Sequence, residues 1–205
     1  MSTPYHHGNL RAALVDAGLE LARAKGPDGV VLREVARQVG VSHNAAYRHF
    51  ADRDDLLLEI ADRGMAELSG AMQARVDALP DELDAVTRAR LRLHEVGRAY
   101  VEFALAEPGL FTAAFSCFSE NAAGREPGSG PYEMLNAALD ELVAVGYLAA
   151  ARRPGAEVTC WAAVHGFSLL HLEGPMRVVD PADRDAALTG LLDTIDRGLG
   201  DPATG

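Results

Sequence analysis

Side chains that can hydrogen-bond to DNA are concentrated in residues 42–49 of this chain. The segment contains the run Ser42-His43-Asn44 and, after two alanines, the run Tyr47-Arg48-His49. An asparagine amide pairs with the edge of adenine, an arginine pairs with guanine or grips phosphate, and tyrosine and histidine bind phosphate oxygens. These residue types at this spacing therefore predict sequence-specific contact with duplex DNA.

A helix-turn-helix is the element that the sequence predicts around these side chains. Val35, Ala36 and Val39 supply the apolar face of one helix, and Gly40 follows it at a position where helices often need positive φ. Ser42 is expected to cap the next helix by accepting a backbone N–H, and that helix is too short to be stable alone. Such a helix is suited to entering the major groove.

The charge of the chain is divided unevenly between its two parts. The net charge is −11, but residues 1–55 hold seven basic and seven acidic side chains, so the excess of acid lies entirely in residues 56–205. Phosphate therefore repels the distal part and not the N-terminal part. A non-specific nucleic-acid binder would be basic overall, so this balance favours a specific site with few contacts.

The remainder of the chain has helical periodicity almost throughout and no alternating strand pattern. After a cap at Asp52, helices are predicted over residues 53–79, 83–106, 110–118, 131–145, 155–172 and 181–199, with a loop over 121–131. The sum is an all-α fold of about nine helices. We expect a DNA-binding domain over residues 1–51 and a larger helical domain over 52–205.

Several other classes of protein are disfavoured by the sequence. It has no apolar run near the roughly 18 residues of a membrane span and no signal-peptide pattern, which predicts a cytoplasmic protein without a membrane partner. Cys117 and Cys160 are interpreted as buried, reduced thiols. No phosphate-binding glycine loop, zinc motif or nucleophile elbow is present, so we expect no enzyme, no cofactor and no metal site.

Several sequence blocks match the pattern of TetR/AcrR-type transcriptional regulators. They are Leu32-Arg33-Glu34-Val35-Ala36, Gly40-Val41-Ser42, Tyr47-Arg48-His49-Phe50 and Leu56-Leu57. The segment 161–166, Trp-Ala-Ala-Val-His-Gly, resembles the Trp-His-Gly (WHG) signature of one C-terminal subclass of that family. The chain therefore resembles a TetR-type regulator with a WHG-type C-terminal domain.

This resemblance, applied only where the blocks align, implies a set of DNA contacts. The implied residues are Arg33, Ser42, His43, Asn44, Tyr47, Arg48, His49 and Arg53. Arg33 and Arg48 are candidates for guanine or phosphate, His43 and Asn44 for bases, and Tyr47, His49 and Arg53 for phosphate. Val31 stands where the family usually has a Ser or Thr cap, and Ala45 where Thr is common. These two departures predict weaker anchoring to the DNA backbone.

The resemblance also implies an effector chamber in the C-terminal domain for a small, largely hydrophobic molecule. Its candidate residues are Phe103, Phe111, Phe115, Phe118, Met134, Trp161 and His165. Trp161 and His165 are equally compatible with an ordinary packed core, so both alternatives stay open at this stage.

In the family, the last two helices of each subunit form the dimer interface, which implies a homodimer on a palindromic operator. Two apolar stripes are available for it, or for the intramolecular core. They are Leu188, Leu191, Ile195 and Leu199, and Val158, Trp161, Val164, Ser168 and His171. The implied function is a repressor that an effector releases from DNA. The alternative is a helix-turn-helix DNA-binding module that has no small-molecule effector.

Overall fold

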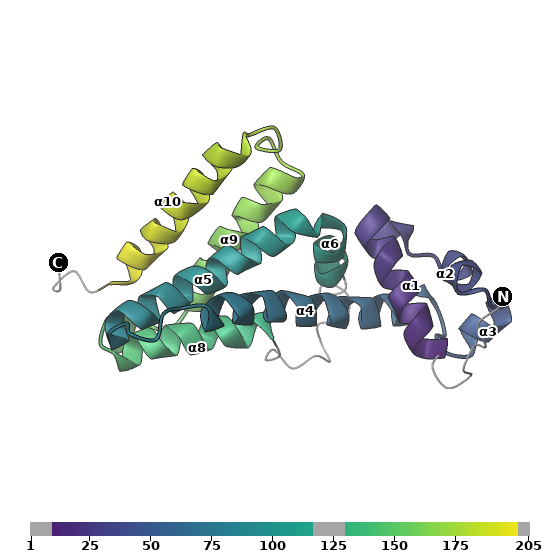
Figure 1. Ribbon diagram of the computed structural model, residues 1–205, viewed down its shortest axis with the longest axis horizontal. Helices are drawn as coiled ribbons and strands as arrows, with labels where there is room; N and C mark the ends of the chain where they lie inside the picture. Colours follow the sequence, from purple (N-terminus) through teal and green to yellow (C-terminus); the bar gives the residue numbers. More distant parts are fainter. Residues whose placement is uncertain (1–9, 117–129, 201–205) are drawn as a thin grey trace. The chain divides into compact units, whose positions relative to one another are not determined.

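The computed structural model describes residues 10–116 and 130–200. Within these ranges the chain forms nine α-helices and two short 3-10 helices, and no strand (Figure 1). The predicted all-α fold is thus confirmed. Cys117, Phe118 and most of the loop predicted over 121–131 lie outside the described residues.

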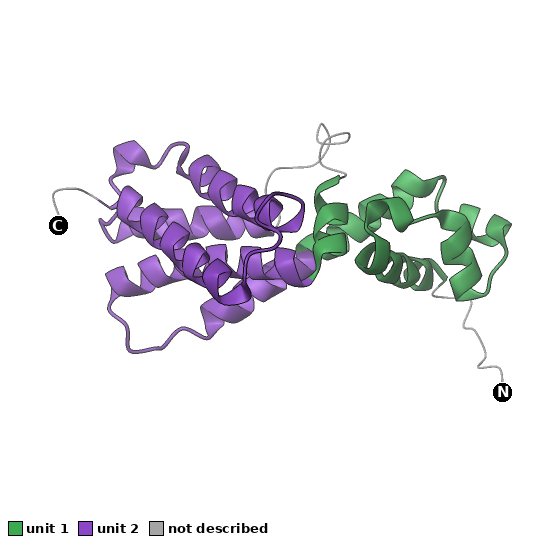
Figure 2. Cartoon of the chain, turned by 90° about the horizontal axis from the view of Figure 1, so that it is seen from above, with its two compact units in different colours: residues 1–65, 107–125 green, residues 66–106, 126–205 purple. Residues whose placement is uncertain are grey.

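The chain divides into two compact units, Met1–Met65 with Glu107–Arg125, and Ala66–Ala106 with Glu126–Gly205 (Figure 2). One long helix, α4, begins in the first unit and continues into the second. The functional boundary after residue 51 stays a prediction, because compactness does not say which residues carry which function.

The first unit is built from four further helices and one 3-10 turn. They are α1 (Leu10–Lys25), η1 (Pro27–Gly29), α2 (Leu32–Val39), α3 (His43–Tyr47) and α6 (Pro108–Ser116), together with the first part of α4 (Arg53–Asp77). α1 packs against both α2 and α6. Leu14, Val35, Phe50 and Ile60 are almost completely buried and form part of this core. Their burial stabilises a unit whose helices would be marginal in isolation.

The helix boundaries follow local signals that the sequence carries. Gly40 ends α2 in the left-handed conformation, at φ 77°. The Asp52 carboxylate accepts the N–H groups of Asp54 and Asp55 at 2.9 Å and so caps α4. Asp180 caps α10 (Pro181–Leu199) by accepting from Ala182. α3 is shorter than predicted, because it ends at Tyr47 and the chain turns over the next two residues.

The second unit is organised around α5 (Ala85–Ala106). This helix packs against α8 (Pro131–Ala144), α9 (Ala156–Leu172) and α10 (Figure 1), and the 3-10 turn η3 (Ala150–Arg152) lies between α8 and α9 in the chain. Its core includes Leu93, Leu139, Leu142 and Cys160. Burial raises the pKa of the Cys160 thiol to about 11, so the thiol stays protonated at neutral pH.

Most of the two apolar stripes on α9 and α10 face the interior of this unit. Buried members include Val164, Ser168, His171, Leu188 and Leu199. These residues therefore belong to the intramolecular core, which was the alternative to a dimer interface. Val158, in contrast, is 64% exposed. No helix in the described parts of the chain is both long and apolar enough to cross a membrane.

Candidate DNA-reading surface and ligand cavity

The short helix α3 presents the predicted DNA-reading side chains to solvent. Ser42 caps it as predicted, since its hydroxyl accepts the N–H of Ala45 at 3.2 Å. Ala46 is fully buried and fixes the inner face of the helix. His43, Asn44, Tyr47 and Arg48 are all exposed. The structure therefore brings four predicted base or phosphate contacts together on α3 and the residue that directly follows it.

Neighbouring rings and charges restrict how these side chains move. The rings of His43 and Tyr47 lie edge to face, with their centroids 4.5 Å apart. Arg11 donates to the carbonyl oxygen of His49 at 2.6 Å and stacks its guanidinium 4.4 Å from the centre of the Phe50 ring. The turn after α3 is thereby tied to α1. Ordered side chains lose less entropy when they bind a ligand.

The start of α2 has the features expected from the departures in its sequence. Val31 occupies the N-cap position with no side-chain hydrogen bond and is 49% exposed. Arg33 is exposed on the first turn of the helix. One turn further, Arg37 forms two hydrogen bonds to Glu34, at 2.8 and 2.6 Å, which hold the pKa of Glu34 below its ordinary value. Arg37 thus offsets the one acidic charge on α2.

Arg53, predicted to clamp phosphate, already has partners within the first unit. Its Nε donates to the carbonyl of Val30 at 2.9 Å, and its Nη2 donates to that of Pro27 at 2.7 Å. Longer ion pairs reach Asp28 at 3.8 Å and Asp54 at 3.6 Å. Arg53 therefore links the start of α4 to the segment that leads into α2. Contact with phosphate stays a prediction.

A cavity that is partly open to solvent lies within the second unit, and the space inside it, with its open part included, is about 300 Å³. It is lined by Met72 of α4, Val96, Gly97 and Tyr100 of α5, Pro131, Tyr132 and Leu135 of α8, and Trp161 and Val164 of α9. No charged side chain among the described residues lines it. Tyr132 and Trp161 form an aromatic wall, with ring centroids 5.3 Å apart. Cavities with apolar walls and few polar groups are typical ligand sites.

Two polar side chains that line this cavity, Tyr100 and Trp161, are bonded to each other, and Tyr100 also binds His165. The Tyr100 hydroxyl lies 2.7 Å from Nδ1 of His165, and the Trp161 indole N–H donates to the Tyr100 oxygen. Since an indole only donates, the Tyr100 proton is directed to His165. Burial raises the pKa of Tyr100 and lowers that of His165. All three side chains are therefore neutral near pH 7.

The predicted pocket residues are distributed over both units. Trp161 lines the cavity and His165 binds its Tyr100. Phe103 is buried in α5, and Met134 is half-buried in α8, but neither lines this cavity. Phe111 and Phe115 belong to the first unit, where their rings pack 4.8 Å apart.

Tyr100 lines the cavity but was not among the residues predicted from the sequence. A tyrosine in the middle of an apolar helical face looks like ordinary core. Its only signal was the hydroxyl, which requires a buried partner, and such a partner was available in the His of the Trp-His-Gly segment.

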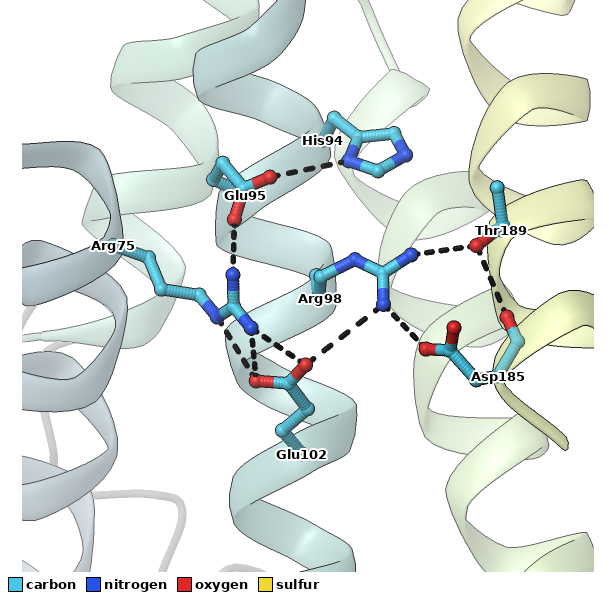
Figure 3. A network of polar contacts seen from close by, with 7 residues as sticks. All are labelled: Arg75, His94, Glu95, Arg98, Glu102, Asp185 and Thr189. Atoms are coloured by element: carbon cyan, nitrogen blue, oxygen red, sulfur yellow. Dashed lines mark hydrogen bonds and ion pairs between the residues drawn. The ribbon is translucent and has the colours of Figure 1, made fainter. Parts of the chain in front are cut away.

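An ionic network joins three helices of the second unit (Figure 3). Arg75 of α4 binds Glu95 at 2.7 Å and Glu102 at 2.6 Å, both on α5. Arg98 of α5 binds Asp185 of α10 at 2.7 Å. α5 is thus tied by charged hydrogen bonds to the helix before it and to the last helix.

Two family patterns match most of this sequence. Residues 14–60 match the family described as bacterial regulatory proteins, tetR family, and residues 93–195 match the tetracyclin repressor-like C-terminal domain. An uncharacterized HTH-type transcriptional regulator of Haemophilus influenzae is 40% identical over 72 residues, which cover 33% of this chain and 35% of that protein. The regulator YobS of Bacillus subtilis is 28% identical over 109 residues, 52% of each chain. The chain thus spans between a third and about half of the length of these relatives.

Solved structures match over nearly the full length. A protein of unknown function from Rhodococcus sp. RHA1 has a TM-score of 0.73 and 30% identity, over 98% of this chain and 100% of that one. A TetR variant from Acinetobacter baumannii AYE, in complex with minocycline, has a TM-score of 0.64 and 22% identity, over 95% and 96% of the two chains. The helix-turn-helix geometry, the family patterns and these folds agree, and the chain belongs to the TetR family of bacterial transcriptional regulators.

Proposed function

We propose that this regulator is a homodimeric repressor that binds a palindromic operator and is released by a small, neutral, largely hydrophobic effector. The observation that carries the proposal is the cavity of the second unit, because its walls are largely apolar and the polar groups of two wall residues, Tyr100 and Trp161, are already hydrogen-bonded to each other and to His165. A charged ligand would lose its hydration there without gaining a charged partner. A neutral, apolar or aromatic molecule fits these walls.

Operator recognition is assigned to α3 and the first turn of α2. The guanidinium groups of Arg33 and Arg48 are exposed and make no hydrogen bond to other described residues, so both are available to DNA. Arg48→Ala is expected to cost about 1–3 kcal/mol of operator binding and to relax specificity at one base position. Equal affinity of the variant and the wild type in a gel shift at the same salt concentration would contradict this role.

Dimerisation is assigned to the outward faces of α9 and α10. On α9 the exposed residues include Val158, Ala162 and Leu169, and on α10 an added Cβ at Gly190 would meet nothing within 4 Å. A helix from a second subunit is able to approach such small and apolar residues closely. One α3 reads few base pairs, and two related by a two-fold axis read the two half-sites of a palindrome.

The oligomer is tested with one surface substitution and its control. Val158→Glu is expected to shift the protein from dimer to monomer in sedimentation experiments and to abolish cooperative binding of two half-sites. Val86→Glu makes the same change at an exposed valine on α5 and is expected to stay dimeric. A dimer that persists in the Val158 variant would exclude this face.

Release by an effector is tested on the operator itself. Footprinting of the DNA upstream of the gene identifies the operator, and a library of neutral hydrophobic compounds is then screened by Trp161 fluorescence and thermal shift. A ligand is expected to lower operator affinity roughly 5–150-fold, the range of a coupling of about 1–3 kcal/mol.

The alternative function is that of a helix-turn-helix regulator with no effector. If no compound alters either the fluorescence or operator affinity, that alternative replaces the proposed one. Trp161 is the only tryptophan of the chain, so its fluorescence reports this cavity without background from another indole.

A further inference from the structure

The guanidinium of Arg11, near the start of α1, contacts three parts of the first unit. Its Nη1 donates to the carbonyl oxygen of His49 at 2.6 Å, and its Nε donates to Oε1 of Glu59 at 3.1 Å. Its Nη2 donates to the same Glu59 oxygen, and its flat face lies over the ring of Phe50, 4.4 Å from the centroid. One side chain thus joins α1, α4 and the turn that follows α3.

These contacts hold the guanidinium in one orientation, because they act in different directions. A guanidinium is planar and donates within its plane, so Glu59 and the His49 carbonyl fix its edges. The Phe50 ring restricts movement out of that plane, and Phe50 is almost completely buried. A lysine ammonium at the same position would be a point charge on a flexible stem and would not hold all three partners at once.

The turn that carries Arg48 and His49 depends on contacts from outside α3. This helix has five residues, too few to be stable alone. Within the turn, the Ala46 carbonyl accepts the N–H groups of both His49 and Phe50, at 2.9 and 3.1 Å. Carbonyl groups at the end of a helix need partners from elsewhere, and Arg11 is the partner of the His49 carbonyl. Arg11 therefore fixes the backbone directly after Arg48.

Glu59 makes this connection depend on the position of α4. It lies on α4, about two turns after the cap at Asp52. Its bonds to Arg11 are charge-assisted and directional, so a displacement of α4 either moves the guanidinium or breaks them. Both changes act on the His49 carbonyl, because the same guanidinium binds it.

We propose that Arg11 is a positioning residue for operator recognition. Through the His49 carbonyl it sets the orientation of Arg48, and through Glu59 it makes that orientation dependent on α4. This inference rests on the proposed function, because it takes α3 and Arg48 as the parts that read the operator. The competing role for an exposed arginine is direct contact with phosphate.

The test uses the full-length protein with two duplexes, one selected from random-sequence DNA by the wild-type protein and one of unselected sequence. Affinity is measured over a range of salt concentrations, and each base pair of the selected duplex is changed in turn. Arg11→Lys keeps the charge and loses the fork, so it is expected to bind the selected duplex about threefold to tenfold more weakly. Its salt slope and its affinity for the unselected duplex are expected to be unchanged. The base position at which Arg48→Ala loses its preference is expected to lose it in Arg11→Lys as well.

Glu59 provides a second test, in which the two roles predict opposite signs. Removal of an acidic charge near DNA strengthens binding by electrostatics alone. The positioning role predicts instead that Glu59→Met weakens binding to the selected duplex, because Arg11 loses the partner that orients it. Asp16→Met removes the same charge from an exposed side chain of α1 that has no hydrogen bond or ion pair with other described residues. This control is expected to bind at least as tightly as the wild type.

Two further variants connect the effects to one interaction. Glu59→Gln keeps an acceptor oxygen at the same place and is expected to restore most of the affinity lost in Glu59→Met. The double variant with Arg11→Lys and Glu59→Met is expected to bind about as weakly as either single variant, because both changes remove the same link.

The outcomes separate this inference from the proposed function. Wild-type affinity and base preference in both Arg11→Lys and Glu59→Met would overturn the positioning role. A salt slope lowered by about one in Arg11→Met but not in Arg11→Lys, with tighter binding by Glu59→Met, would assign Arg11 to phosphate and leave recognition by α3 intact. An equal loss on both duplexes would also overturn the inference, because it would show a general loss of structure. If Arg48→Ala keeps the affinity and preference of the wild type, the proposed recognition by α3 fails and the inference fails with it.

Discussion

Replacement of Arg53 discriminates between two roles for the residue that begins α4. The sequence predicts a phosphate clamp, whereas the structure has its guanidinium bound to the carbonyls of Pro27 and Val30. Arg53→Met removes the charged donors and keeps a stem of similar length. Arg53→Lys keeps the positive charge but lacks the fork that reaches two carbonyls at once. The two roles therefore predict different effects of these variants on the stability of the first unit and on the salt dependence of operator binding.

The magnitude follows from the contacts of the guanidinium. Each hydrogen bond from a charged donor contributes about 1.5–3 kcal/mol, and the low end applies because the Arg53 side chain is 39% exposed. The ion pairs to Asp28 and Asp54 are long and solvated, so they add little. We expect Arg53→Met to destabilise the first unit by about 2–3 kcal/mol and Arg53→Lys by about half of that.

The assay must report the first unit alone, because the chain has two compact units. Amide hydrogen exchange at Val35, whose N–H is bonded to Val31, measures the opening of α2 directly. Operator binding is measured in parallel over a range of salt concentrations. Loss of a phosphate contact lowers the salt slope by about one, whereas loss of a structural link lowers affinity with the slope unchanged.

The reasoning is refuted if exchange in α2 is the same in all three proteins. A lower salt slope in Arg53→Met, with wild-type slope in Arg53→Lys, would establish the phosphate clamp instead. Faster exchange in α2 together with a lower salt slope in Arg53→Met would show that this side chain performs both roles, with its remaining N–H groups on the DNA.

Three further predictions follow from the described contacts. Ser42→Ala removes the cap of α3 and is expected to lower the free energy of unfolding, measured in urea, by about 1 kcal/mol. Ser42→Asp is expected to restore this stability but to weaken operator binding, because its carboxylate faces the DNA phosphates. Burial lowers the pKa of His165 below its ordinary value of 6.5, so the unfolded chain binds more protons below that pH. The free energy of unfolding is therefore expected to fall as pH drops below 6.5, and less so in His165→Gln; equal pH profiles would contradict this. Arg98→Met removes bonds to Asp185 and Thr189 and is expected to destabilise the second unit by about 1–2 kcal/mol, measured by hydrogen exchange in α10.

Local signals made the helix-turn-helix and the caps predictable from sequence. Gly40, Ser42, Asp52 and Asp180 each act on backbone groups within a few residues, so their effects do not depend on the rest of the fold. The end of α3 is less determined, since Arg48 and His49 are compatible with both a helix and a turn. There the path of the chain depends on Phe50, which is buried and packs under the Arg11 guanidinium of α1.

The cavity was less predictable because four helices from distant parts of the sequence form its walls. The family resemblance implied a set of aromatic pocket residues but not the neighbours that each of them contacts. Phe111 and Phe115 pack in the first unit, since α6 lies against α1. Tyr100 and Tyr132 line the cavity because α5 and α8 pack side by side. A single sequence contains no direct record of which helices become neighbours.

The ion pairs of α5 restrict which helix movements are able to transmit ligand binding to the DNA-binding helices. Its carboxylates bind Arg75 of α4, and its Arg98 binds α10, so α5 cannot slide along either helix without losing charged hydrogen bonds. Apolar contacts re-form after a small shift, whereas such bonds depend on direction and distance. A ligand that displaces Met72 therefore moves α4 and α5 together. Among the helices that line the cavity beside Tyr100 and Trp161, α4 is the one that continues into the first unit. Under the proposed function the response to ligand therefore passes along its turns from Met72 to the cap at Asp52.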